Sequence, residues 1–195
     1  MLRVGIIGCG GMGRDHIRRL TEKIQGAEVV AVSDVFEESA KKAAEICGAK
    51  VYTDSRELIN AEDVDAVFIV SPGFAHVDSL LQAIEAGKRI FCEKPLCTTA
   101  EDCLKVVKAE EAAGKHLIQL GFMRRYDKGY QQIKEALATG EYGEPLILHC
   151  THRNPEVGTN YNTPMAVHDT AIHEIDVLHW LVDDEYESAQ VVMPR

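Results

Sequence analysis

Over its first 121 residues the chain alternates between short, continuously apolar runs and stretches whose apolar residues recur at helical spacing. Continuous apolar runs are typical of strands covered on both faces, and the helical stretches supply the crossovers that parallel strands require. The pattern therefore predicts an α/β fold built on a doubly wound parallel sheet of the Rossmann type. We expect strands at residues 3–8, 28–34, 65–71, 88–93 and 115–122, and helices at 11–24, 37–47, 75–87 and 98–114.

The pattern changes near residue 122, which predicts a domain boundary between residues 1–121 and 122–195. In the second part we expect a helix followed by a glycine-bounded turn over 123–143, a helix at 165–182, and strands at 144–155 and 188–194. Two strands and two helices cannot cover a sheet, and the last strand would have unpaired edges. We therefore interpret the second part as the start of an incomplete α+β domain, and the chain as truncated or a fragment of a longer protein.

A glycine-rich turn joins the first apolar run to the first helix and matches the pattern G-x-G-x-x-G. The first glycine of this pattern permits a tight turn, the second lets the backbone approach a pyrophosphate, and the last lets helix and strand pack closely. The free N–H groups at the start of the helix favour phosphate. The cofactor-binding candidates on this turn are Gly8, Gly10, Gly11, Met12 and Gly13.

Asp34 ends the second predicted strand, 21 residues after Gly13. A carboxylate at this position accepts hydrogen bonds from both ribose hydroxyls of a dinucleotide and repels a 2′-phosphate. The sequence therefore predicts NAD, rather than NADP, as the cofactor. The alternative is a structural glycine turn with a solvent-facing aspartate.

Further candidate residues follow the third and fourth apolar runs, at the strand ends that line the ligand crevice of a doubly wound sheet. Ser71, Pro72 and His76 follow the third run, and Glu93 and Lys94 follow the fourth. The ammonium group of Lys94 could stabilise developing alkoxide charge, and we count the other four as cofactor-binding candidates. The alternatives are a surface histidine at position 76 and an ordinary turn at position 94.

On the predicted helix 165–182, Asp169, His173 and Asp176 fall within roughly 60° of one another at ~100° per residue. The opposite side carries an apolar stripe, Ala171, Ile175, Leu178 and Val182. An aspartate one turn before a histidine can accept its ring proton and raise its basicity, which suits a general base. A solvated polar face is the alternative. We predict no metal, because position 177 is valine where HExxH requires histidine.

Composition argues against several kinds of partner. The net charge of −10 does not suit nucleic acid or an anionic membrane. No apolar stretch approaches the ~20 residues that span a bilayer, and the N-terminal run does not have the pattern of a signal peptide. The six cysteines lack the spacing of a zinc site, so we expect reduced, buried thiols in a cytoplasmic protein.

These motifs together resemble the glucose–fructose oxidoreductase/inositol dehydrogenase/rhizopine-catabolism family, and most of all its inositol dehydrogenases. The resemblance rests on GCGGMG, Asp34, SPGFAH, EKP, GFMRRYD and MAVHDTAIHEIDVLHWL, in family order. EKP followed by D-x-x-x-H-x-x-D is far more specific than the glycine motif. The resemblance implies a Rossmann domain, then an α+β domain whose open antiparallel sheet commonly forms the interface of a homo-oligomer.

The resemblance also implies NAD-dependent oxidation of a secondary hydroxyl of a cyclitol or sugar, with myo-inositol as the expected substrate. It makes Lys94 the residue that contacts the reacting hydroxyl, His173 the general base and Asp169 its partner. It implies a cis peptide bond before Pro95, and a substrate hydroxyl on Asp176. Weaker candidates for the polyol-facing wall are Arg124, Tyr126, Asn154 and Thr170. Two alternatives stay open: NAD binding without catalysis by these 195 residues, and another substrate such as scyllo-inositol or glucose.

Overall fold

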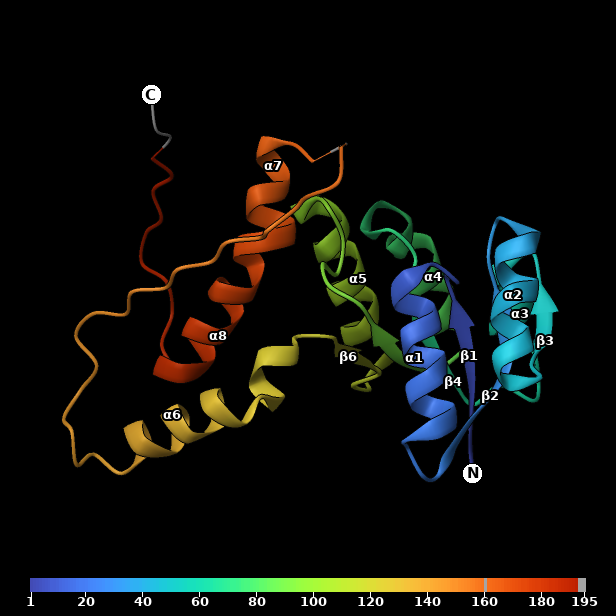
Figure 1. The fold of residues 1–195 in the computed structure, drawn as a ribbon, viewed down its shortest axis with the longest axis horizontal. Helices are drawn as coiled ribbons and strands as arrows, with labels where there is room; N and C mark the ends of the chain where they lie inside the picture. Colours follow the sequence, from blue (N-terminus) through green and yellow to red (C-terminus); the bar gives the residue numbers. More distant parts are fainter. Residues whose placement is uncertain (160, 193–195) are drawn as a thin grey trace. The chain divides into compact units, whose positions relative to one another are not determined.

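The computed structural model describes residues 1–159 and 161–192 of the chain (Figure 1). The chain divides into two compact units, Met1–Gly121 and Phe122–Arg195. We call them unit 1 and unit 2 and describe each by itself.

Unit 1 is built on a parallel sheet of six strands in the order β3-β2-β1-β4-β5-β6. The strands are β1 (Leu2–Ile7), β2 (Ala27–Ser33), β3 (Lys50–Tyr52), β4 (Ala66–Ile69), β5 (Arg89–Cys92) and β6 (Ile118–Leu120). The helices are α1 (Gly11–Glu22), α2 (Glu37–Cys47), α3 (Ser55–Ile59), α4 (His76–Glu85) and α5 (Ala100–Ala113), with a 3₁₀ turn η1 (Gly73–Ala75). Strand order runs in opposite directions on the two sides of β1, which confirms the predicted doubly wound sheet.

The core of unit 1 lies in two apolar clusters, because side chains of β1 alternate between the faces of the sheet. Val4 and Ile6 belong to one cluster with Ile17 of α1, and Ile7 belongs to the other. Gly5 faces the second cluster, where a Cβ atom would lie 2.5 Å from Leu58 Cδ2. The continuous apolar runs of the sequence therefore do mark strands covered on both faces.

Residues 50–59 form two elements that hydrophobic periodicity did not predict. The three-residue strand β3 pairs with β2 through Ala31–Ser33, and α3 begins where the Asp54 side chain accepts a hydrogen bond from Arg56 N. Both elements are shorter than the length over which an apolar period can be recognised.

Unit 2 contains a 3₁₀ turn η2 (Met123–Tyr126) and the helices α6 (Lys128–Ala138), α7 (Thr163–Met165) and α8 (Ile172–Val182), with a π-helical segment η3 (Ala166–Ala171) before α8. The helix predicted within 123–143 is α6, and Gly140 and Gly143 after it have positive φ, as a glycine-bounded turn requires. Asp127 caps α6, because its carboxylate accepts from Gly129 N and Tyr130 N. Lys134 of α6 donates to the backbone oxygens of Trp180 and Leu181, which ties α6 to the end of α8.

The strand predicted at 144–155 is wrong, because these residues have no regular secondary structure. Leu146 and Ile147 are 91% and 89% exposed. A strand is stable only in a ladder with another strand, and unit 2 offers no strand among residues 122–159 and 161–192. Of the strand predicted at 188–194, residues 188–192 are also irregular, and 193–194 lie outside the described residues.

Within residues 1–159 and 161–192, no helix has the length and apolar character needed to cross a membrane. The six cysteines are free thiols, but the prediction that they are buried holds only for Cys9, Cys92 and Cys97, and Cys150 is exposed.

Candidate active site

The glycine turn of unit 1 is shaped by two close backbone approaches. Gly8 has φ +97°, and a Cβ atom there would lie 2.5 Å from Ser71 N. At Gly13 a Cβ atom would lie 2.0 Å from Gly8 O, so α1 packs directly on the turn. At Gly10 and Gly11, by contrast, a Cβ atom would meet nothing within 4 Å. The turn is therefore tight where the protein packs on itself and open at the start of α1, where phosphates bind helix N–H groups.

Asp34 directly follows β2 and is bound to the glycine turn. Its Oδ2 accepts a hydrogen bond from Cys9 N at 2.7 Å, and its Oδ1 accepts from Phe36 N at 2.9 Å. Each carboxylate oxygen has a second acceptor site, and the residue is partly exposed. The carboxylate can therefore still accept from ribose hydroxyls while its position relative to the turn is fixed.

Glu93, a predicted cofactor-binding residue, is held by a residue that the sequence reasoning missed. Its Oε1 lies 2.8 Å from His16 Nε2, and its Oε2 accepts from Lys94 N at 3.2 Å. The His16 ring packs edge-on against Phe68 and Phe91. Burial acts to raise the pKa of the Glu93 carboxyl, but the bonds from His16 and Lys94 N outweigh it and hold the pKa below its usual value.

His16 could have been found from helix geometry. Gly13, Ile17 and Leu20 are the buried residues of α1, and His16 lies three residues after Gly13 on the same inward side. A histidine on the inner face of the helix that follows a glycine turn is a polar group that needs a partner. Glu93 at the end of β5 is that partner.

The structure contradicts both predictions made for His76, a contact with the cofactor and a position on the surface. It is completely buried, so it is not a surface histidine. Its Nδ1 lies 2.8 Å from Pro95 O, and its Nε2 lies 2.7 Å from Ser71 O. Both ring nitrogens face backbone carbonyls, which leaves neither for the predicted direct contact with a cofactor.

The segments after β4 and β5 lie against each other in unit 1. A Cβ atom at Gly73, next to Pro72, would lie 3.0 Å from the Pro95 ring. The Lys94–Pro95 bond is cis, as the resemblance implied. Lys94 is half-buried and follows β5 by two residues. The glycine turn, the Ser71–Pro72 segment and the Glu93–Pro95 segment are therefore neighbours at the carboxyl ends of the strands.

In unit 2 the predicted orientation of the last helix is wrong. His173 and Asp176 are buried together with Val177 and Leu181, whereas Ile175 of the predicted apolar stripe is 45% exposed. The prediction assumed a regular helix from 165 to 182. The π-helical segment at 166–171, which carries Asp169 and Thr170, changes the angle assumed between Asp169 and His173. Within α8 itself the helix is regular, and its buried side is the one that carries His173 and Asp176.

Asp176 can lie inside because it is paired with Arg125, which the sequence reasoning did not select. Arg125 Nε donates to Asp176 Oδ2 at 3.0 Å, and its Nη2 donates to Oδ1. The bond to Asp176 raises the pKa of the Arg125 guanidinium. Such a two-pronged pair compensates the cost of burying the carboxylate.

Arg124 and Asn154, two candidates for the polyol-facing wall, belong to one polar network of unit 2. Arg124 bonds to Glu174, His152 Nδ1 lies 3.2 Å from Glu174 Oε2, and His152 Nε2 lies 3.2 Å from Asn154 Oδ1. Burial acts to raise the pKa of Glu174, yet the bonds from His152 and Arg124 lower it. The other two candidates are separate: Thr170 Oγ1 bonds to the Tyr161 hydroxyl at 2.8 Å, and Tyr126 is exposed.

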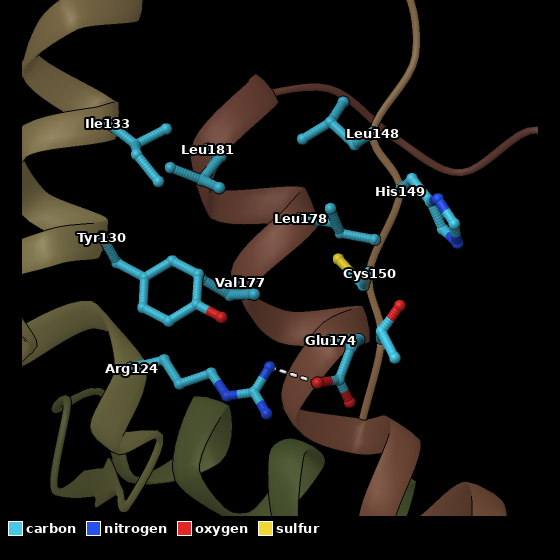
Figure 2. A pocket seen from close by; sticks show the side chains of 11 residues that line it. Arg124, Tyr130, Ile133, Leu148, His149, Cys150, Glu174, Val177, Leu178 and Leu181 are labelled. Carbon is cyan, nitrogen blue, oxygen red and sulfur yellow. Dashed lines mark hydrogen bonds and ion pairs between the residues drawn. The ribbon is translucent and has the colours of Figure 1, made fainter. Parts of the chain in front are cut away.

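A cavity of about 340 Å³ lies beside this network, between α6, α8 and the segment 148–151 (Figure 2). Arg124 and Glu174 form one end, and the other end is apolar, with Ile133, Leu178 and Leu181 around it. A polyol needs hydrogen-bonding groups around most of its hydroxyls, so we do not assign the substrate to this cavity. In residues 1–159 and 161–192 no cluster of three or more metal-ligating side chains occurs.

Two family models match the chain, one over unit 1 and one over unit 2. The oxidoreductase family with an NAD-binding Rossmann fold matches residues 2–122, and the GFO/IDH/MocA C-terminal domain matches residues 130–195. The chain therefore belongs to the GFO/IDH/MocA oxidoreductase family.

Individual relatives in this family are inositol dehydrogenases. The chain is 55% identical to the inositol 2-dehydrogenase/D-chiro-inositol 3-dehydrogenase of Halalkalibacterium halodurans, and 54% identical to the inositol 2-dehydrogenase of Pseudomonas syringae pv. syringae. Both matches cover all of this chain but only 56% and 58% of the relatives. The chain thus spans little more than half of their length.

Two solved structures show the same likeness. The myo-inositol dehydrogenase from Lactobacillus casei, in complex with NAD(H) and myo-inositol, matches with a TM-score of 0.97 and 50% identity, over all of this chain and 58% of that one. The scyllo-inositol dehydrogenase from Lactobacillus casei, with NAD(H) and scyllo-inositol, matches with a TM-score of 0.81 and 27% identity, over 94% of this chain and 56% of that one.

Proposed function

We propose that the protein is an NAD-dependent dehydrogenase that oxidises a secondary hydroxyl of a cyclitol, with myo-inositol converted to 2-keto-myo-inositol. The observation that carries the proposal is the match over the whole chain, at 50% identity and a TM-score of 0.97, to a myo-inositol dehydrogenase with NAD(H) and myo-inositol. The family, the glycine turn and Asp34 all agree with it.

Unit 1 fits NAD at two places. Open space at Gly10 and Gly11 lets a pyrophosphate reach the first N–H groups of α1. The Asp34 carboxylate, fixed by Cys9 N, is placed to accept from the adenosine ribose and to disfavour a 2′-phosphate. NAD, when bound, supplies the acceptor for the hydride. We propose residues 1–121 as the NAD-binding domain and 122–195 as the beginning of the substrate and oligomerisation domain.

The reacting groups are assigned by chemistry. Lys94 donates a hydrogen bond to the reacting oxygen and stabilises its partial negative charge. His173 removes the hydroxyl proton as the carbon loses hydride, and Asp169 orients the imidazole. Asp176, bound to Arg125, keeps one free acceptor site on each oxygen for a substrate hydroxyl. Arg124, Asn154 and Thr170 are the further candidates for substrate contacts.

The assignment is tested with the full-length product of the gene. NADH formation is followed with myo-inositol, scyllo-inositol and glucose, each with NAD and with NADP. We expect turnover with NAD and myo-inositol, and much weaker turnover with NADP. NAD binding by calorimetry without NADH formation from any polyol would instead show a nucleotide-binding protein without this catalysis.

His173→Ala separates the general base from the cofactor site. We expect kcat to fall roughly 10²- to 10⁴-fold, the usual range for a lost general base, with NAD affinity nearly unchanged. Equal turnover in the variant contradicts the role given to His173. We further propose that the protein binds neither nucleic acid nor an anionic membrane, because the chain carries a net charge of −10. The family resemblance is the basis for proposing a homo-oligomer, and the scattered cysteines, which lack the spacing of a zinc site, are the basis for proposing a cytoplasmic location.

A further inference from the structure

The proposed mechanism gives no role to His16, although its ring is bonded to the residue that directly precedes Lys94. His16 lies on α1, five residues after the open start of this helix at Gly10 and Gly11. Its Nε2 is 2.8 Å from Glu93 Oε1. The helix proposed to face the pyrophosphate is therefore also the helix that holds the segment after β5.

The sheet stops holding the backbone of this segment just before Lys94. Cys92 O accepts from Gly121 N at 2.8 Å, and Glu93 N donates to Ile69 O at 2.9 Å. Lys94 N donates instead to the Glu93 side chain, with Oε2 at 3.2 Å. At Lys94 a carboxylate thus takes the place that neighbouring strands have at the two residues before it.

A glutamate side chain has several rotatable bonds, so it holds a backbone amide in place only if it is itself fixed. His16 supplies that attachment at the other carboxylate oxygen. Burial acts to raise the pKa of the Glu93 carboxyl, but the bonds from His16 and Lys94 N hold the pKa below its usual value, so the group is ionised at neutral pH. An ionised carboxylate only accepts hydrogen bonds, so Nε2 of His16 is the donor.

The imidazole of His16 is in turn fixed by two aromatic rings. Phe68 of β4 and Phe91 of β5 are paired in the sheet, and their ring centroids lie 5.8 Å and 5.3 Å from that of His16, both in edge-on contact. The side chains of His16 and Glu93 are only 17% and 18% exposed. The pair is therefore held between the sheet and α1, and water has little access to replace it.

We propose that His16 is a positioning residue for the reaction: by fixing the Glu93 carboxylate, it fixes the backbone N–H of Lys94 and thereby the placement of that lysine. The proposal rests on the catalytic role proposed for Lys94, but the link from His16 to the Lys94 amide is independent of that role.

The link is tested first, without any activity measurement. His16→Leu keeps an apolar side chain against Phe68 and Phe91 but has no N–H group. Hydrogen–deuterium exchange of the full-length product of the gene, read by fragmentation mass spectrometry, follows the Lys94 amide. We expect it to exchange roughly 5-fold faster in the variant, as for one lost hydrogen bond, while the amides of β1 are unchanged. An unchanged rate at Lys94 overturns the proposal, whatever the enzyme turns over.

The effect on the reaction is tested by kinetics of the same full-length protein. In His16→Leu we expect kcat with myo-inositol to fall about 10- to 100-fold, as for a displaced catalytic group. The Kd for NAD, measured by calorimetry, should stay within about twofold, because the open start of α1 is untouched. The matched control is His116→Leu, which replaces an exposed histidine of unit 1 and should leave kcat unchanged.

A double-mutant cycle tests whether His16 acts through Glu93. Glu93→Ala removes the carboxylate, so His16 has nothing left to fix. We therefore expect the variant with both His16→Leu and Glu93→Ala to have the same kcat as Glu93→Ala alone. Losses that multiply in the double variant show independent effects and overturn the proposed route.

The failure of this proposal can be told apart from the failure of the proposed function. An unchanged kcat in His16→Leu overturns the positioning role, and so does a fall in kcat that is matched by the loss of folded protein in a thermal scan. If the unmodified enzyme oxidises no polyol, the proposed function fails, and the exchange rate of the Lys94 amide still decides whether His16 holds it.

Discussion

At the residue scale, the two kinds of glycine in the turn have different consequences for folding and for binding. A Cβ atom at Gly13 would lie 2.0 Å from Gly8 O, a backbone atom that cannot move aside cheaply. We expect Gly13→Ala to lower the free energy of unfolding by about 1 to 3 kcal/mol, as overpacking does. Gly10→Ala, which meets nothing within 4 Å, should keep the stability of the unmodified chain but obstruct the pyrophosphate.

Urea denaturation and calorimetry with NAD distinguish the two effects. Gly13→Ala should lose both stability and affinity, whereas Gly10→Ala should lose affinity alone. A Gly13→Ala variant as stable as the unmodified chain would show that α1 does not pack on the turn in this way.

The His16–Glu93 pair gives unit 1 a pH-dependent contribution to stability. The pKa of Glu93 is lowered in the folded chain, so its contribution is present above the unfolded carboxyl pKa and is lost as pH falls through the folded value. We expect His16→Gln to be less stable than the unmodified chain by about 1 kcal/mol at pH 6, the net contribution of one typical intramolecular hydrogen bond.

Urea denaturation from pH 6 down to pH 3 measures this difference. It should shrink as Glu93 becomes protonated, because the unmodified chain then loses the same interaction. A difference that stays constant over the whole range would mean that His16 stabilises unit 1 by packing on Phe68 and Phe91 instead.

At the element scale, the packing of α8 depends on the ion pair between Arg125 and the buried carboxylate of Asp176. The Asp176 side chain is 5% exposed and accepts two hydrogen bonds from Arg125. Arg125→Met leaves the carboxylate without this partner, so we expect unit 2 to lose about 2 to 3 kcal/mol of stability. Hydrogen exchange of the α8 amides measures the loss. Arg153→Met removes an exposed arginine and should leave the exchange rates unchanged.

Strand 65–71 and helix α8 show what could be predicted from the sequence and what could not. Strands such as 65–71 could be predicted because a continuous apolar run is buried on both faces of the sheet. The buried side of α8 could not, because the apolar stripe pointed to the Ile175 side, whereas Asp176 lies inside with a partner 51 residues away. A distant partner leaves no local signal in the sequence.

In the candidate site, too, the local motifs could be predicted and the contacts with distant residues could not. The glycine turn and Asp34 are local motifs whose geometry the structure supports. The partners that hold the candidate residues, His16 for Glu93 and Glu174 for Arg124, come from other elements and were not predicted. His76 was expected to bind the cofactor or to lie on the surface, and its burial between Ser71 and Pro95 could be known only from the fold.

At the scale of the whole molecule, unit 1 has its own sheet and its own two-sided core. We therefore expect residues 1–121 alone to fold cooperatively and to bind NAD with an affinity close to that of the longer chain. Circular dichroism melting and calorimetry test both statements, with Gly10→Ala as the variant that should fold without binding. A fragment that melts without a transition would show that the fold of unit 1 depends on residues beyond 121.

The position of β1 has a consequence for synthesis of the chain. β1 is made first but lies in the middle of the sheet, paired with β2 on one side and with β4 on the other. Its second edge stays open until Ala66–Ile69 has left the ribosome, a longer wait than any other strand of the sheet has for its next neighbour. Open apolar edges are where nascent chains mispair. We therefore expect the strand that leads into the glycine turn to be the one most exposed to mispairing while the chain is being made.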